Sequence, residues 1–304
     1  MVFDTEKVKE LQEKMESCEK LTRTQNIFYL NDKDLKRKNV KFTYSNNEMI
    51  EYAKCFSSKE YFIESNFNVK LMDFQKNIIK HYDKNRFIIF AKSMQIGFTN
   101  IMSWIYLWEL IFNPDFTITY IDNKMKNMIE MIDKIKNNYK KLPFFLKPGV
   151  ERWDLKHVCF DNKNRFICDT AADVAFGYET TILHVNDLSL MTKRKIELIY
   201  GSYVPLVSSA PNKKMIISSF FTGENFFYDL YKGSLKKGPM SNMFETMRIP
   251  YSVIQGRDEV WKKQQIELFG GGDIGETLFE ERFNVKVNSK RKRKIMRMIK
   301  NNFK

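Results

Sequence analysis

The chain has 304 residues, of which 43% are hydrophobic and 29% charged, a composition typical of a folded globular protein and unlike that of a disordered chain. The net charge is +14, and nine basic residues and no acidic one lie within positions 286–304. Such a basic stretch favours a polyanionic partner, most often nucleic acid, with a solvated end of the chain as the alternative.

The cysteines and histidines indicate no metal or redox site. The four cysteines form no CxxC pair, and the three histidines lack the spacing of zinc ligands. The charged first 30 residues do not resemble a signal peptide, and the longest apolar run, around 101–112, is interrupted by Glu109. We therefore expect an intracellular protein with no membrane partner.

The first third of the chain reads as helical. Residues 1–25 carry apolar side chains at helical spacing, 26–46 is a polar connector, and 48–65 is again helical. We predict that 1–65 forms a helical N-terminal segment with a connector. A further helix at 71–82 leads directly into the central part of the chain.

Strands and helices alternate through the middle of the chain. The expected strands are 87–91, 116–121, 181–185, 214–219 and 247–252. The expected helices are 99–112, 226–231 and 259–269, together with one that begins after a cap at Asp122 or Asn123. A β-hairpin is expected at 158–168. This alternation predicts an α/β domain over 66–287, with a parallel sheet covered by helices on both faces and an added β-hairpin. Residues 288–304 then form a basic tail.

Residues 84–100 (KNRFIIFAKSMQIGFTN) contain the most informative motif, an apolar strand, a tight loop and a helix. This is the layout of a phosphate-binding loop. Gly97 and Thr99 fit the last Gly and the Ser/Thr of the Walker A pattern, whereas Phe98 stands at the lysine and Lys92 at the first Gly. The loop thus has the layout of an ATP site without its main positive charge.

Eight segments in chain order carry a resemblance over residues 62–287. They are LMDFQ (71–75), MQIGFT (94–99), LPF to VERW (142–153), AFG (175–177), ILHVNDLS (182–189), PLVSS with MIISS (205–219), TGENFFY (222–228) and GRDEVW (256–261). In this order and spacing they resemble the ATPase domain of the large terminase subunit, the DNA-packaging motor of tailed phages. The resemblance implies a P-loop NTPase-like fold.

The resemblance also implies a site and its partners. Asp187 would be the catalytic carboxylate, and Thr99 and Asp187 would hold Mg²⁺. ATP with Mg²⁺ would be the cofactor, and double-stranded DNA would be the substrate. The protein partners would be the portal, the small terminase or an intact terminase or nuclease subunit. The protein would act in the cytoplasm of an infected host. The residues implied for nucleotide binding are Gln75, Lys92, Gln95, Gly97, Thr99, Asn186 and Ser219.

Several positions depart from the family pattern. Phe98 replaces the Walker A lysine, Phe176 the arginine before a glycine, and Asn186 the Walker B aspartate, while Asp187 replaces the catalytic glutamate and Phe220 follows Ser219. Loss of such an arginine alone lowers phosphoryl transfer by about 10³–10⁵. We predict impaired hydrolysis and a role as a DNA or packaging-complex binding module, without a nuclease domain. The alternative is an active DNA-translocating ATPase that uses Lys92 and Asp187.

Some of these residues have simpler structural interpretations. Lys92 could be a surface charge at a strand end, Asp187 a helix cap, Gln75 a surface amide, and His184 a buried core histidine. We further expect the 94–99 loop and positions 186–187 to lie on adjacent strand ends, and the Phe98 ring to point inward.

The DNA contacts are predicted in the basic tail, where they would be non-specific and sensitive to salt. The residues expected to carry them are Lys290, Arg291, Lys292, Arg293, Lys294, Arg297 and Lys300.

Overall fold

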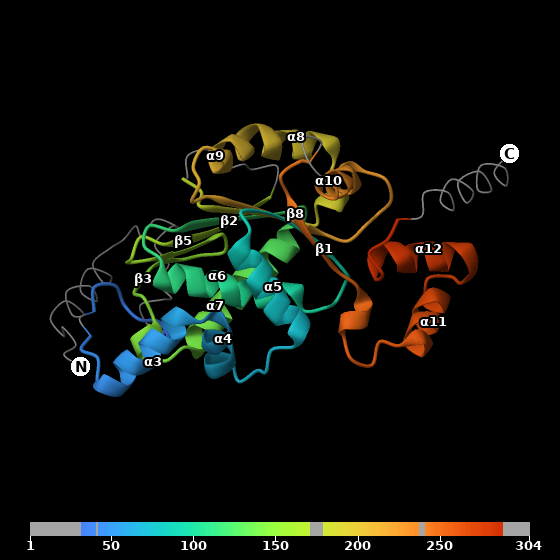
Figure 1. Ribbon diagram of the computed structural model, residues 1–304. Helices are drawn as coiled ribbons and strands as arrows, with labels where there is room; N and C mark the ends of the chain where they lie inside the picture. The colour runs from blue at the N-terminus through green and yellow to red at the C-terminus, as the bar shows by residue number, and fades with distance from the viewer. Residues whose placement is uncertain (1–31, 41, 171–178, 237–240, 288–304) are drawn as a thin grey trace, which may run out of the picture.

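A computed structural model of the chain describes residues 32–40, 42–170, 179–236 and 241–287. Within them, an eight-stranded sheet runs through the molecule between two layers of helices (Figure 1). The strands are β1 (Phe87–Lys92), β2 (Thr117–Asp122), β3 (Val150–Trp153), β4 (His157–Phe160), β5 (Arg165–Thr170), β6 (Ile182–Asn186), β7 (Lys214–Ser219) and β8 (Glu245–Ile249). The predicted α/β fold is confirmed. The predicted helix in 1–25, Phe176 and the basic tail lie outside the described residues.

Within the described residues, the predicted helices are present in order, but three further helices, two within 193–208 and one at 272–282, were not predicted from the sequence, and one predicted helix is divided. The stretch 48–65 is two helices, because Ser58 ends the first and caps the second by accepting a hydrogen bond from the Tyr61 amide at 3.1 Å. The helices are α3 (Asn46–Ser57), α4 (Lys59–Phe67), α5 (Asp73–Lys84), α6 (Phe98–Phe112), α7 (Met125–Lys141), α8 (Lys193–Ser202), α9 (Val204–Ser208), α10 (Phe226–Ser234), α11 (Glu259–Leu268) and α12 (Gly272–Arg282). Short 3-10 turns are η1 (Phe144–Leu146), η2 (Leu188–Leu190) and η4 (Tyr251–Val253).

The strand order is β3-β4-β5-β2-β6-β7-β1-β8. The pairings from β5 to β8 are all parallel, whereas β4 runs antiparallel to both β3 and β5. The predicted hairpin is present as β4–β5, and it continues the central sheet because β5 pairs with β2. The carboxyl ends of six strands therefore meet at one edge, where open α/β sheets bind their ligands.

The prediction that the loop after β1 and positions 186–187 lie on adjacent strand ends is wrong. Strand β7 lies between β6 and β1 and pairs in parallel with both. Apolar periodicity identifies each strand locally, but strand order depends on packing between segments far apart in sequence, which the pattern does not encode.

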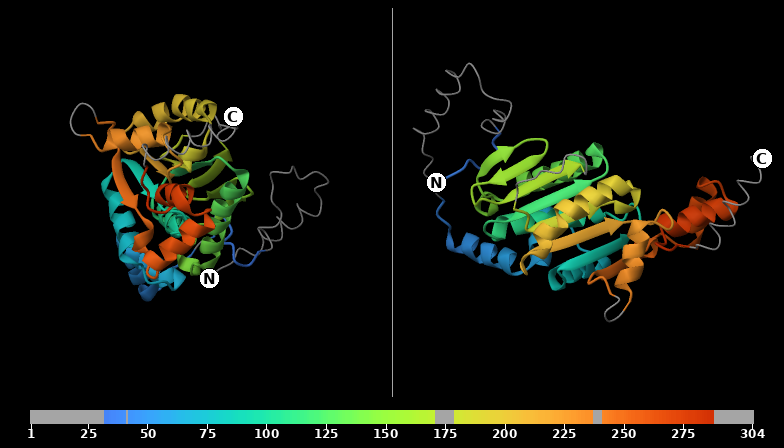
Figure 2. Two further views of the ribbon diagram at one scale, coloured as in Figure 1. Left: turned by 90° about the vertical axis from the view of Figure 1, so that its right-hand side faces the viewer. Right: turned by 90° about the horizontal axis from the view of Figure 1, so that it is seen from above.

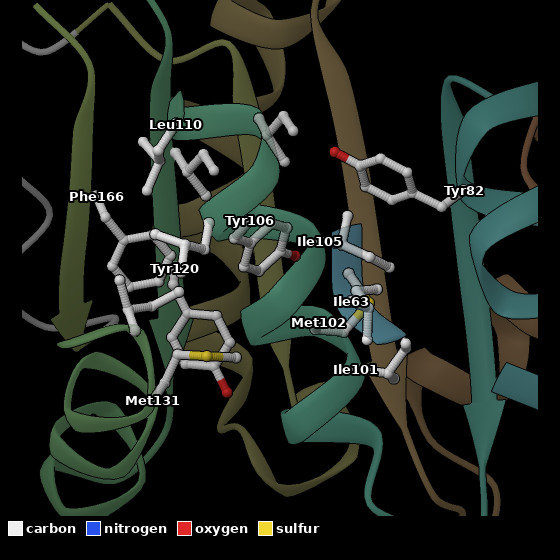
Figure 3. Packing of buried hydrophobic residues seen from close by; sticks show 14 of the residues in the cluster. Ile63, Tyr82, Ile101, Met102, Ile105, Tyr106, Leu110, Tyr120, Met131 and Phe166 are labelled. Carbon is white, nitrogen blue, oxygen red and sulfur yellow. The ribbon is translucent and has the colours of Figure 1, made fainter. Parts of the chain in front are cut away.

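Two hydrophobic layers cover the sheet. Helices α3–α7 lie on one face and α8–α10 on the other, while α11 and α12 extend beyond one end (Figures 1 and 2). Figure 3 shows Tyr106 of α6 packing toward Tyr120 of β2 and Phe166 of β5. The centroid of the Phe166 ring lies 5.9 Å from that of Tyr106 and 6.4 Å from that of Tyr120. Helix α6 is buried along most of its length because it crosses the centre of this layer. Among the described helices, none has the length and apolar character needed to span a membrane.

Candidate functional site

The loop between β1 and α6 presents open backbone amides. Gln95 (φ 56°) and Gly97 (φ 74°) adopt left-handed conformations, which turn the chain sharply before the 15-residue helix α6. Within the described part of the chain, the N–H groups of residues 95–99 have no hydrogen-bond acceptor. A Cβ atom added to Gly97 would meet nothing within 4 Å. Amides arranged in this way at a helix N-terminus suit an anion such as phosphate.

The loop is held by the segment at the C-terminal side of the domain. Arg257 Nη2 donates to the Gln95 carbonyl at 2.7 Å, the Met94 amide to the Arg282 carbonyl at 2.9 Å, and the Ser93 amide to Ile249 at 2.7 Å. Arg257 lies in the GRDEVW motif, yet sequence alone did not place it in the site. Its contact with the loop exists only because the fold brings these segments together.

Phe98 points inward, as predicted. Its side chain is 5% exposed, and its ring packs edge-on against Phe90 with centroids 5.1 Å apart and lies 6.3 Å from His184. Burying a phenylalanine contributes about 1.5–3 kcal/mol. The position that would carry a lysine therefore stabilises the start of α6 instead of offering a charge.

Besides Arg257, Lys92 supplies a positive charge near the start of α6, with its ammonium 5.5 Å from the centre of the Phe98 ring. Its ammonium lies 3.0 Å from Asp187 Oδ1, across the end of the intervening strand β7, and the two side chains are only 11% and 15% exposed. The interpretation of Lys92 as a strand-end surface charge is therefore wrong. The helix-cap interpretation of Asp187 is also wrong. Asp187 precedes η2, but its carboxylate makes no cap hydrogen bond and accepts from Lys92 instead. The fold thus brings both residues of the predicted variant site together.

Asn186 is engaged at both ends of its amide. Ser218 Oγ donates to Asn186 Oδ1 at 2.7 Å, and Asn186 Nδ2 donates to Asp122 Oδ2 at 2.7 Å. Burial raises the pKa of Asp122. Sequence reasoning considered Asp122 only as a cap for the next helix. The signal for a site was its position at the end of an apolar strand, which it shares with Asn186.

His184 is a satisfied core histidine, as predicted. Its Nδ1 lies 2.7 Å from the Tyr106 hydroxyl and its Nε2 2.7 Å from Ser218 Oγ, and the side chain is buried. Burial, with a smaller contribution from the Lys92 charge, lowers its pKa to about 3. The ring is therefore neutral at physiological pH and links α6 to β7.

The pH dependence of stability should report this buried ring. Because the pKa of His184 falls from 6.5 to about 3 on folding, the unfolded chain binds more protons between these values. The free energy of unfolding should therefore decrease as the pH falls from about 6.5. Urea unfolding at about pH 7 and about pH 5 should show a steeper loss for the wild type than for His184→Gln. Tyr106→Phe removes a hydrogen bond but no group that titrates in this pH range, because burial raises the pKa of Tyr106 well above its usual value. It should keep the wild-type slope, and equal slopes in all three proteins would contradict the prediction.

Ser219 is the last residue of β7, and Gln75 lies in the first turn of α5. Ser219 Oγ donates to Ser189 Oγ at 2.8 Å and accepts from the Ser189 amide at 3.2 Å, which ties the end of β7 to the turn after Asp187. Gln75 is 8% exposed, and its Oε1 accepts a hydrogen bond from the Met72 amide at 2.9 Å. The surface-amide interpretation of Gln75 is therefore wrong, because this side chain closes the start of α5.

The polar groups at the strand ends suit a magnesium ion that arrives with a nucleotide. Among the described residues there is no group of three or more His, Cys, Asp or Glu side chains arranged to hold a metal. Magnesium usually keeps several waters and is bound by one or two carboxylates together with substrate phosphates. Thr99 in the first turn of α6 and Asp187 after β6 are the residues that would supply protein ligands of this kind.

Comparison with known proteins finds no matching family model, but several solved structures share the fold. The ATPase domain of the large terminase from Thermus phage P74-26 aligns with a TM-score of 0.60 and 16% identity over 74% of this chain and 97% of that domain. The large terminase of the thermophilic bacteriophage D6E, also solved with ADP and with ATP-γ-S, aligns at 0.54 with 12% identity over 71% of this chain and 53% of its own. That of bacteriophage HK97 aligns at 0.51 with 11% identity, over 64% of this chain and 42% of its own. This chain therefore has the fold of the ATPase domain of phage large terminases.

Proposed function

We propose that this chain is a phage DNA-packaging ATPase whose variant nucleotide site uses Lys92 and Asp187. The observation that carries the proposal is the 3.0 Å ion pair between these side chains at the strand ends, beside a loop with five open amides. The likeness to large terminase ATPase domains supports it. In this reading Lys92 stabilises phosphate charge and Thr99 and Asp187 hold the magnesium that accompanies ATP.

The second candidate is the one predicted first from the sequence, a module that binds DNA or the packaging complex and is impaired in hydrolysis. It is favoured by Phe98, whose ring occupies the lysine position, and by Asn186, a neutral side chain already bound at both ends. An arginine and a magnesium carboxylate together supply much of the catalysis in phosphoryl transfer. Without them, nucleotide would be bound but turned over slowly.

Two measurements on the purified protein separate these candidates. A melting curve with and without Mg-ATP reports binding, and a phosphate-release assay with linear double-stranded DNA reports turnover. An upward shift with DNA-stimulated release supports the variant ATPase. A shift without release supports the hydrolysis-impaired module, and no shift with no release contradicts nucleotide use altogether.

The proposed partners are double-stranded DNA and the packaging complex, namely the portal, the small terminase or an intact terminase or nuclease subunit, in the host cytoplasm. DNA binding is proposed to depend on the basic residues within 288–304, which lie outside the described part of the chain.

Deleting 288–304 should weaken DNA binding and flatten its salt dependence. Each phosphate contact contributes about 0.9 to the slope of log K against log salt, so losing several contacts changes the slope measurably. The measurement is a fluorescence-anisotropy titration at several salt concentrations. The double variant Lys193→Gln/Arg194→Gln, which removes two charges from α8, is the control and should leave the slope close to that of the wild type. An unchanged slope after the deletion would show that the tail does not contact DNA.

A further inference from the structure

Asp122 is a buried carboxylate at the centre of the strand ends. It is the last residue of β2 and lies beside β6, since Ile121 pairs with Val185 in the parallel register, and its side chain is fully buried. Its oxygens accept hydrogen bonds from Asn186 Nδ2 at 2.7 Å, from the Lys124 amide at 2.9 Å and from Asn127 Nδ2 at 3.0 Å. These three donors are neutral. A buried charge stabilised only by neutral donors is costly to keep, so its position needs an explanation.

A directional hydrogen-bond chain fixes the orientation of Asn186. An ionised carboxylate can only accept, so the Asn186 NH₂ group must face Asp122 and its carbonyl oxygen must face Ser218. Ser218 Oγ donates to that oxygen and therefore accepts from His184 Nε2, while His184 Nδ1 accepts from the Tyr106 hydroxyl. Each group in this series of hydrogen bonds can therefore donate or accept in only one way. The series runs from Tyr106 of α6 through residues of β6 and β7 to Asp122 of β2.

We propose that the acidic member of this pair is Asp122 in place of residue 186: Asp122 carries the buried negative charge of the site, and Asn186 positions it. We call this arrangement the exchange. The contact distance of 2.7 Å explains why only one of the two can be acidic. Two carboxylates this close cannot both ionise. An aspartate at 186 beside Asp122 would place two such groups together, whereas the exchanged pair keeps one charge and one donor.

The exchange has a consequence for magnesium that rests on the proposed function. Asp122 adds negative potential at the strand ends close to Asp187, and the two carboxylates interact electrostatically. A hydrated Mg²⁺ accompanying nucleotide phosphates is favoured by such potential. Asp122 acts on the ion through the local electrostatic field and does not touch it, and Asn186 is the positioning residue that holds the Asp122 carboxylate.

The exchange itself is tested by a stability cycle that needs no nucleotide. Asn186→Asp should lower the melting temperature by about 5 °C, because it forces two carboxylates together. Asp122→Asn should cost less, since it removes a buried charge: the amide oxygen can still accept from Lys124 and Asn127, and the Asn186 amide can reverse to accept from the new NH₂ group. The double variant Asp122→Asn/Asn186→Asp should recover most of the loss of Asn186→Asp. A double variant no more stable than Asn186→Asp would overturn the exchange.

The magnesium consequence is tested by titrating Mg²⁺ into protein with a fluorescent ATP analogue. Asp122→Asn should need at least about tenfold more Mg²⁺ for half-maximal binding, a loss that the double variant should reverse. The control is Thr119→Val, at a position on the same strand as Asp122. This variant removes the buried hydrogen bond between Thr119 and Thr180 (2.8 Å) and leaves the charge unchanged. Equal Mg²⁺ requirements for Asp122→Asn and Thr119→Val would show that Asp122 does not contribute to Mg²⁺ binding through its charge. If the wild type binds no nucleotide, the proposed function fails, while the stability cycle still decides the exchange.

Discussion

Replacing Lys92 with methionine is expected to abolish DNA-stimulated phosphate release, with a loss of about 10²–10³-fold, and to weaken nucleotide binding. Lys92 supplies the ammonium that lies 3.0 Å from Asp187, next to the open amides of the loop. Methionine has a similar length and no charge, so the phosphates would lose their main cation. The measurements are phosphate release with DNA and the melting-curve shift on adding Mg-ATP.

Lys59→Met is a matched control for this variant. Lys59 has the same side-chain exposure as Lys92 (11%) and is also ion-paired, with Asp83 at 2.7 Å and Glu109 at 3.3 Å. Both variants leave a carboxylate without its partner and should lose some stability. Only Lys92→Met should lose the response to Mg-ATP. A wild-type response in Lys92→Met would show that the Lys92–Asp187 pair is purely structural.

Introducing the Walker A lysine as Phe98→Lys is expected to destabilise the protein strongly. Removing a buried aromatic ring typically costs about 3–5 kcal/mol. The new ammonium would also enter a site where the Lys92 ammonium already lies 5.5 Å from the centre of the Phe98 ring. Mg-ATP should recover part of the lost melting temperature, because phosphates would neutralise the added charge. Hydrolysis should not increase, since Asn186 and Phe176 are unchanged.

The comparison variant for this prediction is Phe98→Leu. Leucine keeps an apolar group against Phe90 and should cost much less than lysine at the same position. Melting curves of the three proteins, each with and without Mg-ATP, make the test. A Phe98→Lys protein as stable as Phe98→Leu would mean that the ring contributes little and that position 98 tolerates a cation.

Much of the fold could be predicted because its signals are local. The strand-loop-helix unit around Gly97, the hairpin at 158–168 and the buried strand ending at Asn186 each follow from apolar patterning and turn residues. The inward Phe98 ring and the buried, hydrogen-bonded His184 follow from the same reasoning, since an aromatic ring in a tight loop and an imidazole in an apolar strand are best accommodated in the core. The break at Ser58 was missed because apolar spacing continues across it.

The amino-acid sequence by itself determined the α/β class, the phosphate-loop layout and the terminase-like order of motifs, because these depend on residues close together in the chain. The tertiary structure decided which side chains meet. Strand β7 separates β1 from β6, yet Lys92 reaches Asp187 across its end; Arg257 holds the loop; and Asp122 meets Asn186 from a different strand. These contacts join residues between 64 and 162 positions apart, and strand order and long-range pairing arise from burial of whole faces, which no local pattern specifies.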